Sequence, residues 1–346
     1  MPATIYDIAR HAGVSSSTVA RVLRGSQKGA RKDSADRAAH IRRIADELGY
    51  RPNLRARAFS EQRTKGVGLL YTDDAWVFEG VNDKVVQGLV KELRKYGHHL
   101  LLVPVDEQGD WEEVVLGGHV DGCLTFQALP KEVRTGIEDA QLPCVLLGDN
   151  SDPELPQILV DDHGGAYAAA RHLISLGHRR IGFYVHNTVK PHCSIAERRA
   201  GFEAAMHDAG LKPESWHTSD AEMIDVLLRS ADRPTGLICY SDLESTLITH
   251  AMWQYGLKVP HDLSVIGFND KFATQYMSPP LTTVGFDANK IGELGAEMII
   301  RSIAGEDEGE RAISLKPPVL HVKTKLIVRG STSPPAGLRQ PTMSSS

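Results

Sequence analysis

The sequence predicts a small all-α unit followed by a larger α/β body, and three observations support this division. Residues 1–65 hold 14 Lys and Arg against 6 Asp and Glu, a net charge of +8, whereas the remainder holds 25 against 38, a net charge of −13. Apolar residues recur at helical spacing before residue 50, and apolar runs alternate with helical segments after residue 66. A chain of 346 residues is also long enough for about two or three domains.

Three helices are expected in the first fifty residues. Thr4 and Asp7 have capping-box spacing, so the first helix starts at Thr4 and ends by Gly13. Ser15 is a good N-cap for a second helix, which gives a helix-turn-helix, and a third helix is expected over residues 34–48. The inward positions of the three helices are Ile5, Ile8, Ala9 and Ala12, then Val19, Val22 and Leu23, then Ala38, Ile41, Ile44, Ala45 and Leu48.

The outward face of the second helix carries Ser16, Ser17, Thr18 and Arg21. If this helix lies in a major groove, its N-terminal side chains reach base edges, and Arg21 can donate two hydrogen bonds to a guanine. The spacing alone also fits a plain helical hairpin. The excess of basic residues in the same segment favours nucleic-acid binding.

The segment 51–65 is basic and has Leu54, Ala58 and Phe59 at helical spacing. An isolated helix of this length is marginal in water. It is therefore either a linker or a hinge that becomes helical only when a partner supplies packing.

The body is expected to contain two Rossmann-like sub-domains with parallel sheets that meet near residues 158–165. Strands alternate with helices throughout, which favours parallel sheets covered on both faces. Ligands of such open sheets collect at the carboxyl ends of the strands, so a cleft between the sub-domains is the expected binding site. The expected strands are 66–72, 99–105, 120–126, 144–149, 179–185, 235–241 and 263–268, and the expected helices are 81–97, 164–177 and 198–210.

Signatures of catalysis and of cofactor binding are absent from the sequence. It has no complete dinucleotide fingerprint, G-x-S-x-G, phosphate loop or H-E-x-x-H, so neither a cofactor nor a metal is expected. His98 and His99 follow a helix C-terminus and are interpreted as surface residues. Cys123, Cys144, Cys193 and Cys239 are widely spaced and interpreted as buried, reduced thiols. No export signal or spanning segment is evident, so a cytoplasmic location is expected.

Several motifs occur in the order found in one family of transcription factors. The segments TIYDIARHAGVSSSTVARVLRG, ELGYRPN, LSVIGFND and SPPLTTV resemble the lactose-repressor (LacI/GalR) family from Thr4 to about Thr332. The resemblance implies a helix-turn-helix headpiece on a periplasmic-binding-protein-like body. It also implies near-palindromic operator DNA and a small-molecule effector, a sugar or sugar derivative, as partners.

The resemblance assigns roles to individual residues. It places Arg198 against effector hydroxyls or carboxylates, aromatic groups near the first strand against the ligand, and Phe59 as an apolar wedge in the minor groove. DNA-binding residues are expected to be Thr4, Tyr6, Ser15, Ser16, Ser17, Thr18, Arg21, Arg24, Tyr50, Asn53, Ala56 and Phe59. Effector-binding residues are expected to be Asp73, Trp76, Phe78, Phe126, Arg198, Ser241 and Asn269.

Two positions depart from the sugar-binding members of that family. Those members commonly carry Asn where this chain has Ser241, and Asp where it has Asn269. Either the effector is not a simple sugar, with Lys190 and Arg199 as candidate extra cations, or the two residues are ordinary turn residues at strand ends.

The sequence therefore predicts a DNA-binding transcriptional regulator, a repressor, controlled by an effector in the cleft and located at the nucleoid. The alternatives are a solute-binding protein of transport or chemotaxis and, less favoured, an α/β enzyme acting on sugars or nucleotides. The expected boundaries are a headpiece over 1–50, a hinge over 51–65, a first sub-domain over 66–160 and 286–316, a second over 161–285 and 317–332, and a disordered tail over 333–346. The tail has no leucine heptads, so a homodimer is expected and not a coiled-coil tetramer.

Overall fold

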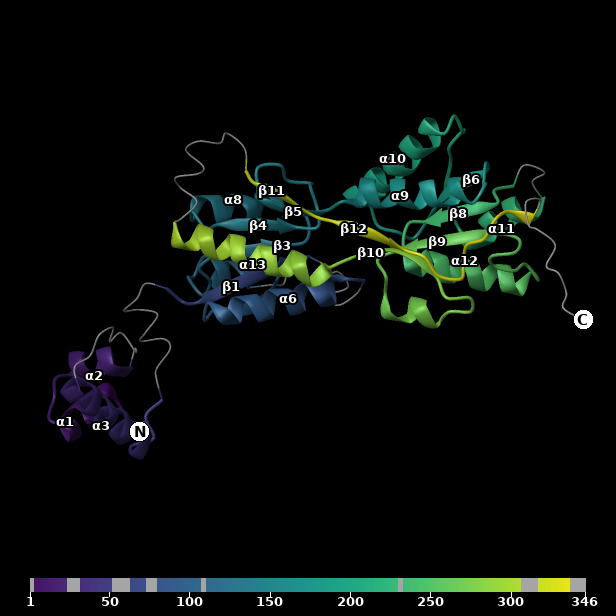
Figure 1. Cartoon of the computed structure of the whole chain (residues 1–346). Coiled ribbons are helices and arrows are strands. Elements are labelled where there is room, and N and C mark those ends of the chain that lie inside the picture. The colour runs from purple at the N-terminus through teal and green to yellow at the C-terminus, as the bar shows by residue number, and fades with distance from the viewer. Residues whose placement is uncertain are drawn as a thin grey trace, which may run out of the picture. The chain divides into compact units, whose positions relative to one another are not determined.

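The structure, a computed structural model, describes residues 3–23, 32–51, 63–72, 80–106, 110–229, 233–305 and 317–336. The chain divides into two compact units, Met1–Thr64 and Lys65–Ser346 (Figure 1). The first is a helical headpiece and the second an α/β body. In the described residues, no helix has the length and apolar character needed to cross a membrane.

The headpiece contains the three expected helices, α1 (Ile5–Ala12), α2 (Ser16–Leu23) and α3 (Lys32–Glu47). Helix α1 begins at a complete capping box between Thr4 and Asp7 and ends at Gly13, whose φ of 63° is left-handed. The expected inward side chains form one cluster, in which Ile8, Val19 and Ile41 have no exposed surface. The prediction of a helix-turn-helix closed by a third helix is therefore confirmed.

The body contains two six-stranded sheets (Figure 1). The first sheet has the strand order β11-β5-β4-β3-β1-β2 and the second β12-β10-β9-β8-β6-β7; all strand pairs are parallel except β10 with β12. The first sheet is built from β1 (Gly66–Tyr71), β2 (His99–Pro104), β3 (Cys123–Thr125), β4 (Cys144–Leu147), β5 (Gln157–Val160) and β11 (Val319–Val322). The second is built from β6 (Ile181–His186), β7 (Glu214–Thr218), β8 (Gly236–Cys239), β9 (Ser264–Phe268), β10 (Thr282–Phe286) and β12 (Thr324–Ile327).

The chain crosses between the two sheets three times. The first two crossings precede helices α9 (Asp162–Ser175) and α13 (Ala288–Ala304), whose N-cap side chains are Asp161 and Asp287. The third runs from β11 to β12 through Lys323. Val319–Val322, part of a segment assigned from sequence to the second sub-domain, lie instead in the first sheet, because β11 pairs with β5.

Helices cover both sheets. Around the first sheet lie α6 (Asn82–Lys95), α7 (Trp111–Val115), α8 (Lys131–Asp139) and α13, and around the second lie α9, α10 (Cys193–Asp208), α11 (Asp220–Arg229), α12 (Asp242–Gln254) and the 3₁₀ turn η1 (Phe272–Tyr276). Helices α9 and α10 cross closely at Gly201, where a Cβ atom would lie 2.1 Å from the carbonyl oxygen of His163. This close crossing sets the start of α9 beside the middle of α10.

Some expectations from the sequence need correction. His98 is buried, not on the surface, and burial lowers the pKa of its ring, whereas His99 is exposed. Ser333 is ordered, since its backbone N–H donates to the Ser264 hydroxyl at 3.1 Å; the expected tail from residue 337 onward lies outside the described residues.

The cysteines follow the sequence prediction with one difference. All four are free; Cys123, Cys144 and Cys239 are buried, but Cys193 is only half-buried. Burial raises the pKa of the Cys144 and Cys193 thiols to about 12. These groups are therefore protonated at neutral pH.

Candidate functional site

The outward face of α2 combines short hydroxyl side chains with one arginine. The Ser15 hydroxyl accepts the backbone N–H of Thr18 at 3.3 Å, and it lies 2.9 Å from the hydroxyls of both Ser17 and Thr18. Ser15 and Ser17 are exposed, as is Arg21 one turn further along. A capped helix N-terminus lined with hydroxyls, followed by an arginine, has the composition of a groove-reading helix.

The remaining headpiece residues divide into three groups. Tyr6 is 72% exposed beside the Thr4 cap, so its side chain is available to a partner. Tyr50 instead packs against the headpiece core, and its backbone N–H donates to Ala45 at 2.8 Å. The other predicted DNA-binding residues, Arg24, Asn53, Ala56 and Phe59, lie outside the described residues.

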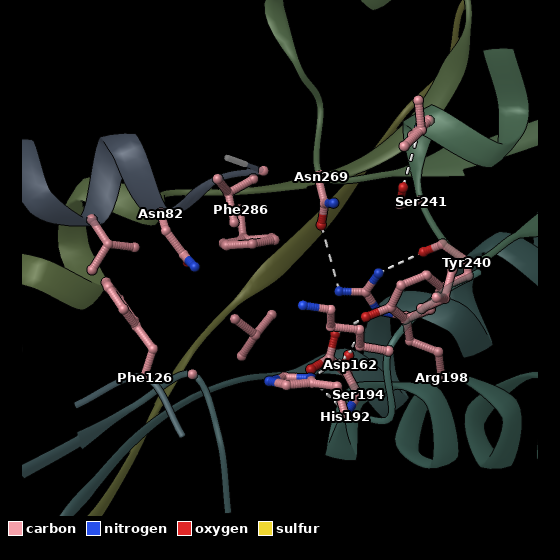
Figure 2. A pocket seen from close by; sticks show the side chains of 18 of the residues that line it. Asn82, Phe126, Asp162, His192, Ser194, Arg198, Tyr240, Ser241, Asn269 and Phe286 are labelled. Carbon is pink, nitrogen blue, oxygen red and sulfur yellow. Dashed lines mark hydrogen bonds and ion pairs between the residues drawn. The ribbon is translucent and has the colours of Figure 1, made fainter. Parts of the chain in front are cut away.

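The body has a pocket of about 390 Å³ between its two sheets, of the size that takes a small metabolite. From the side of the first sheet, Phe126, Leu147 and the start of α6 line it. From the side of the second sheet, polar residues line it at the carboxyl ends of strands (Figure 2). This is the cleft expected from the α/β alternation.

Arg198 occupies the centre of the polar wall and is 5% exposed. Its Nε donates to Asp162 Oδ1 at 2.7 Å and its Nη1 to the Tyr240 carbonyl at 2.5 Å. The guanidinium also lies over the Phe268 ring, 3.6 Å from its centroid. Arg198 stands inside α10, because this helix begins five residues earlier than the sequence predicts, at Cys193. The buried pair holds the guanidinium in one orientation, facing the pocket.

Asn269 completes this arrangement. Its φ of 106° is a left-handed backbone conformation that Asn tolerates better than most residues. Its Oδ1 lies 3.5 Å from Arg198 Nη2 (Figure 2). Because arginine has only donors, the amide oxygen must face Arg198 and the amide NH2 group must face elsewhere.

Ser241 has a local structural role. It is the N-cap of α12: its hydroxyl accepts the backbone N–H of Leu243 at 3.1 Å and donates to Glu244 at 2.5 Å. Ser241 and Glu244 have capping-box spacing. Ser241 lines the pocket, as predicted, but its hydroxyl proton is held by Glu244.

His192 and Ser194 also line the pocket and were not identified from the sequence. His192 caps α10, because its Nδ1 accepts the Ser194 backbone N–H at 3.2 Å. The Ser194 hydroxyl lies 2.8 Å from this Nδ1 and 2.9 Å from the Tyr240 hydroxyl. Burial lowers the pKa of His192, so the ring is neutral at pH 7.

Asp149, His192 and Cys193 bring three potential metal ligands within 4.8 Å of one another. The Cys193 thiol is 3.9 Å from the Gly148 carbonyl oxygen, so this cluster joins the end of β4 to the start of α10. Asp149 accepts hydrogen bonds from Asn150 and Ser151. Each member has hydrogen-bond partners in the protein, and the cluster links the two sheets.

The other predicted effector residues have different outcomes. Phe126 and Lys190 line the pocket, whereas Arg199 is not among the lining residues. Asp73, Trp76 and Phe78 lie outside the described residues. Tyr240 and Lys271 are lining residues that sequence reasoning missed, although Tyr240 directly follows β8 and Lys271 lies three residues after the end of β9, where a ligand is expected.

Comparison with protein families gives two matches along the chain. Residues 4–53 match the family of bacterial regulatory proteins named lacI, and residues 170–332 match the periplasmic binding protein-like domain. The first match covers the helix-turn-helix and the second covers all six strands of the second sheet.

Relatives match over nearly the full length. The transcriptional regulator DegA of Bacillus subtilis is 30% identical, with 96% of this chain and 99% of DegA covered. The HTH-type transcriptional repressor PurR of Vibrio atlanticus is 26% identical, with 93% of this chain and 98% of PurR covered. A solved structure of the lac repressor dimer with operator and anti-inducer has a TM-score of 0.76, 21% identity and coverage of 96% and 100%. The chain belongs to the lacI family of bacterial regulatory proteins and is a DNA-binding transcriptional regulator.

Proposed function

We propose that this regulator is a repressor that reads operator DNA with α2 and changes its operator affinity when a small metabolite binds between the sheets of its body. The observation that best supports this proposal is the pocket at the carboxyl ends of the strands, where the oriented Arg198 faces a cavity of about 390 Å³. Similar structures support it: a LacI family transcriptional regulator of Enterococcus faecium has bound ribose, and the transcriptional regulator CelR is in complex with cellobiose.

The structure of the pocket suggests how a ligand is coupled to DNA. Its two walls belong to sheets that are joined by three crossings, so a ligand that contacts both walls favours one arrangement of the sheets over another. If DNA also favours one of these arrangements, the two affinities are reciprocally linked. The predicted hinge and the Phe59 wedge would transmit the change to a near-palindromic operator at the nucleoid.

A homodimer is the form that matches a near-palindromic operator. The body exposes large apolar side chains that support such an interface. Phe272 and Tyr276 are 72% and 70% exposed with ring centroids 5.1 Å apart, and Trp253 on α12 is 73% exposed. The Thr246 hydroxyl lies 3.7 Å from the Met277 sulfur, so α12 and the end of η1 are neighbours. Exposed aromatic groups such as the Phe272–Tyr276 pair are typical of interaction surfaces.

A non-enzymatic role is part of the proposal. The two carboxylates of the pocket lining are engaged, Asp162 with Arg198 and Glu244 with Ser241, and the protonated Cys193 thiol is a poor nucleophile. A solute-binding protein would use the same body, but the basic helix-turn-helix favours the regulator.

A thermal-shift screen of sugars, sugar acids, sugar phosphates and purines tests the proposal, followed by operator binding with each ligand that raises the melting temperature. We expect at least one ligand to change operator affinity. A ligand that binds the pocket and leaves operator affinity unchanged would contradict effector control, and turnover of the ligand would favour an enzyme.

A further inference from the structure

We propose that the effector carries an anionic oxygen group, a carboxylate or a phosphate, which binds the polar wall formed by His192, Asn269 and Lys271. This inference rests on the proposed function, because it names the chemistry of the ligand in the same pocket. It follows from which hydrogen-bonding groups of the pocket lining donate and which accept.

His192 supplies a donor. Its Nδ1 accepts a backbone N–H, which can only donate, so the proton of the neutral ring is on Nε2. The remaining ring nitrogen is therefore an N–H group in a residue that lines the pocket.

Asn269 supplies a second donor. Its amide oxygen faces Arg198, so the group that it can offer a ligand is its NH2. An aspartate at this position could only accept hydrogen bonds from ligand hydroxyls. The NH2 group of the asparagine instead donates, so it matches a ligand oxygen that accepts a hydrogen bond.

Positive charge adds to these donors on both walls. Lys271 lines the pocket on a backbone fixed by its N–H, which donates to Asp242 Oδ2 at 2.7 Å, and Lys190 lines the pocket as well. On the opposite wall, the 14-residue helix α6 begins at the pocket with Gly80, Val81 and Asn82. Its N-cap residue, Val81, has no polar side chain, so it cannot cap the first backbone N–H groups. The positive end of the helix dipole favours an anion there, although Asp83 in the first turn offsets part of it.

The carboxylates of the lining do not offset this charge. Asp162 is held by Arg198, and Glu244 accepts the Ser241 hydroxyl of the α12 cap. The lining contains Lys190, Arg198 and Lys271 against Asp162 and Glu244. One positive charge is left over, and the groups that His192 and Asn269 offer to a ligand are donors. An anionic oxygen group matches both features.

The test is binding of matched ligands to the full-length protein by calorimetry. The probes are neutral pentoses and hexoses, their aldonates and uronates, their monophosphates, and inorganic phosphate. We expect an anion to bind at least about tenfold more tightly than its neutral parent sugar. Comparing the affinities of the carboxylates with those of the phosphates shows which of the two anionic groups the pocket prefers.

Single-residue variants test which side chains cause the preference for an anion. Lys271→Met is expected to weaken the anion at least about tenfold and Lys271→Arg to restore most of the affinity, because the charge returns. Asn269→Asp keeps the size and the Arg198 contact but replaces the NH2 donor with an acceptor, so it should weaken the anion and not the neutral sugar. Lys131→Met removes an exposed lysine of α8 that does not line the pocket, and it should bind like the parent protein. Thermal melting confirms that each variant is folded.

Two results would overturn the inference. One is a neutral sugar that binds at least tenfold more tightly than its acid and phosphate; the other is no binding of any anion at millimolar concentration. Operator affinity is measured separately with each bound ligand. A neutral ligand that changes operator affinity therefore overturns the anion inference and leaves the proposed function intact.

Discussion

The face of the headpiece that we propose to read DNA and the pocket of the body hold their candidate functional side chains in opposite ways. On α2, Ser17 and Arg21 are exposed on the outer side of a helix whose stability comes from the buried Val19 and Val22. In the pocket, Arg198 and Asp162 are 5% and 6% exposed and hydrogen-bonded to each other. On the headpiece, the side chains proposed to contact DNA are therefore different from those that stabilise the fold. In the pocket, Arg198 and Asp162 serve both purposes.

The largest effect is expected for Arg198→Ala. It leaves the buried Asp162 carboxylate without its partner, so the free energy of unfolding of the body should fall by about 3–5 kcal/mol, and the ligand response should be lost. Chemical denaturation and ligand calorimetry measure the two effects. A double variant, Arg198→Met with Asp162→Asn, removes both charges and should recover part of the stability without recovering the ligand response. If Arg198→Ala leaves the free energy of unfolding unchanged, the pocket residues do not stabilise the fold, and the proposed dual role of Arg198 is wrong.

In the headpiece, loss of stability is expected only from the inner side of the helices. Ile41 has no exposed surface, so Ile41→Ala should lower the stability of the headpiece by about 2–4 kcal/mol. Hydrogen exchange of the two units should show the loss in Met1–Thr64 alone. The neighbouring exposed Arg42→Ala is the control. An equal loss in the body would show that the units do not fold separately.

Asp242 should make the stability of the body depend on pH. Burial raises its pKa from 3.8 to about 6, although its carboxylate accepts hydrogen bonds from Thr283 and the Lys271 backbone. The folded protein therefore holds this proton more tightly between about pH 4 and 6, and the contribution of Asp242 to stability falls as pH rises through that window. Its full size is about 1–3 kcal/mol.

Denaturation at pH 5 and pH 7.5 measures this contribution. Asp242→Asn removes the titrating group, so the stability of the parent protein relative to the variant should be higher at pH 5 than at pH 7.5. The same pH slope in both proteins would show that Asp242 does not titrate in this range.

Arg21→Ala should affect DNA alone. Loss of a base contact weakens binding to the specific operator by about 1–3 kcal/mol and relaxes discrimination at one base pair. The free energy of unfolding should change by less than about 0.5 kcal/mol, because Arg21 is exposed. Binding to operator and to random DNA at one salt concentration separates these effects. Equal losses on both DNAs would make Arg21 a phosphate contact.

The same contrast explains what the sequence could predict. The headpiece follows from local signals: Thr4, Asp7 and Gly13 define a helix through caps that lie within ten residues. The alternation of strands and helices likewise predicts the two sheets. The pairing of β11 with β5 joins segments about 160 residues apart, and no local pattern carries this information.

The pocket was predicted only in part. The resemblance to the family identified Arg198, Ser241 and Asn269, which line the pocket. His192 was missed because its role as helix cap depends on α10 starting at Cys193, in a segment that has the composition of a loop. The buried pair of Arg198 with Asp162 depends on the close crossing of α9 and α10, which a single sequence does not show.

The most direct test of effector control is a thermodynamic cycle on the full-length protein. The operator dissociation constant is measured with and without saturating ligand, and the ligand dissociation constant with and without saturating operator. Because linkage is reciprocal, both should change by the same factor, about 5-fold to 150-fold. A ligand that fills the pocket and leaves both constants unchanged would contradict the proposal that this cavity controls DNA binding.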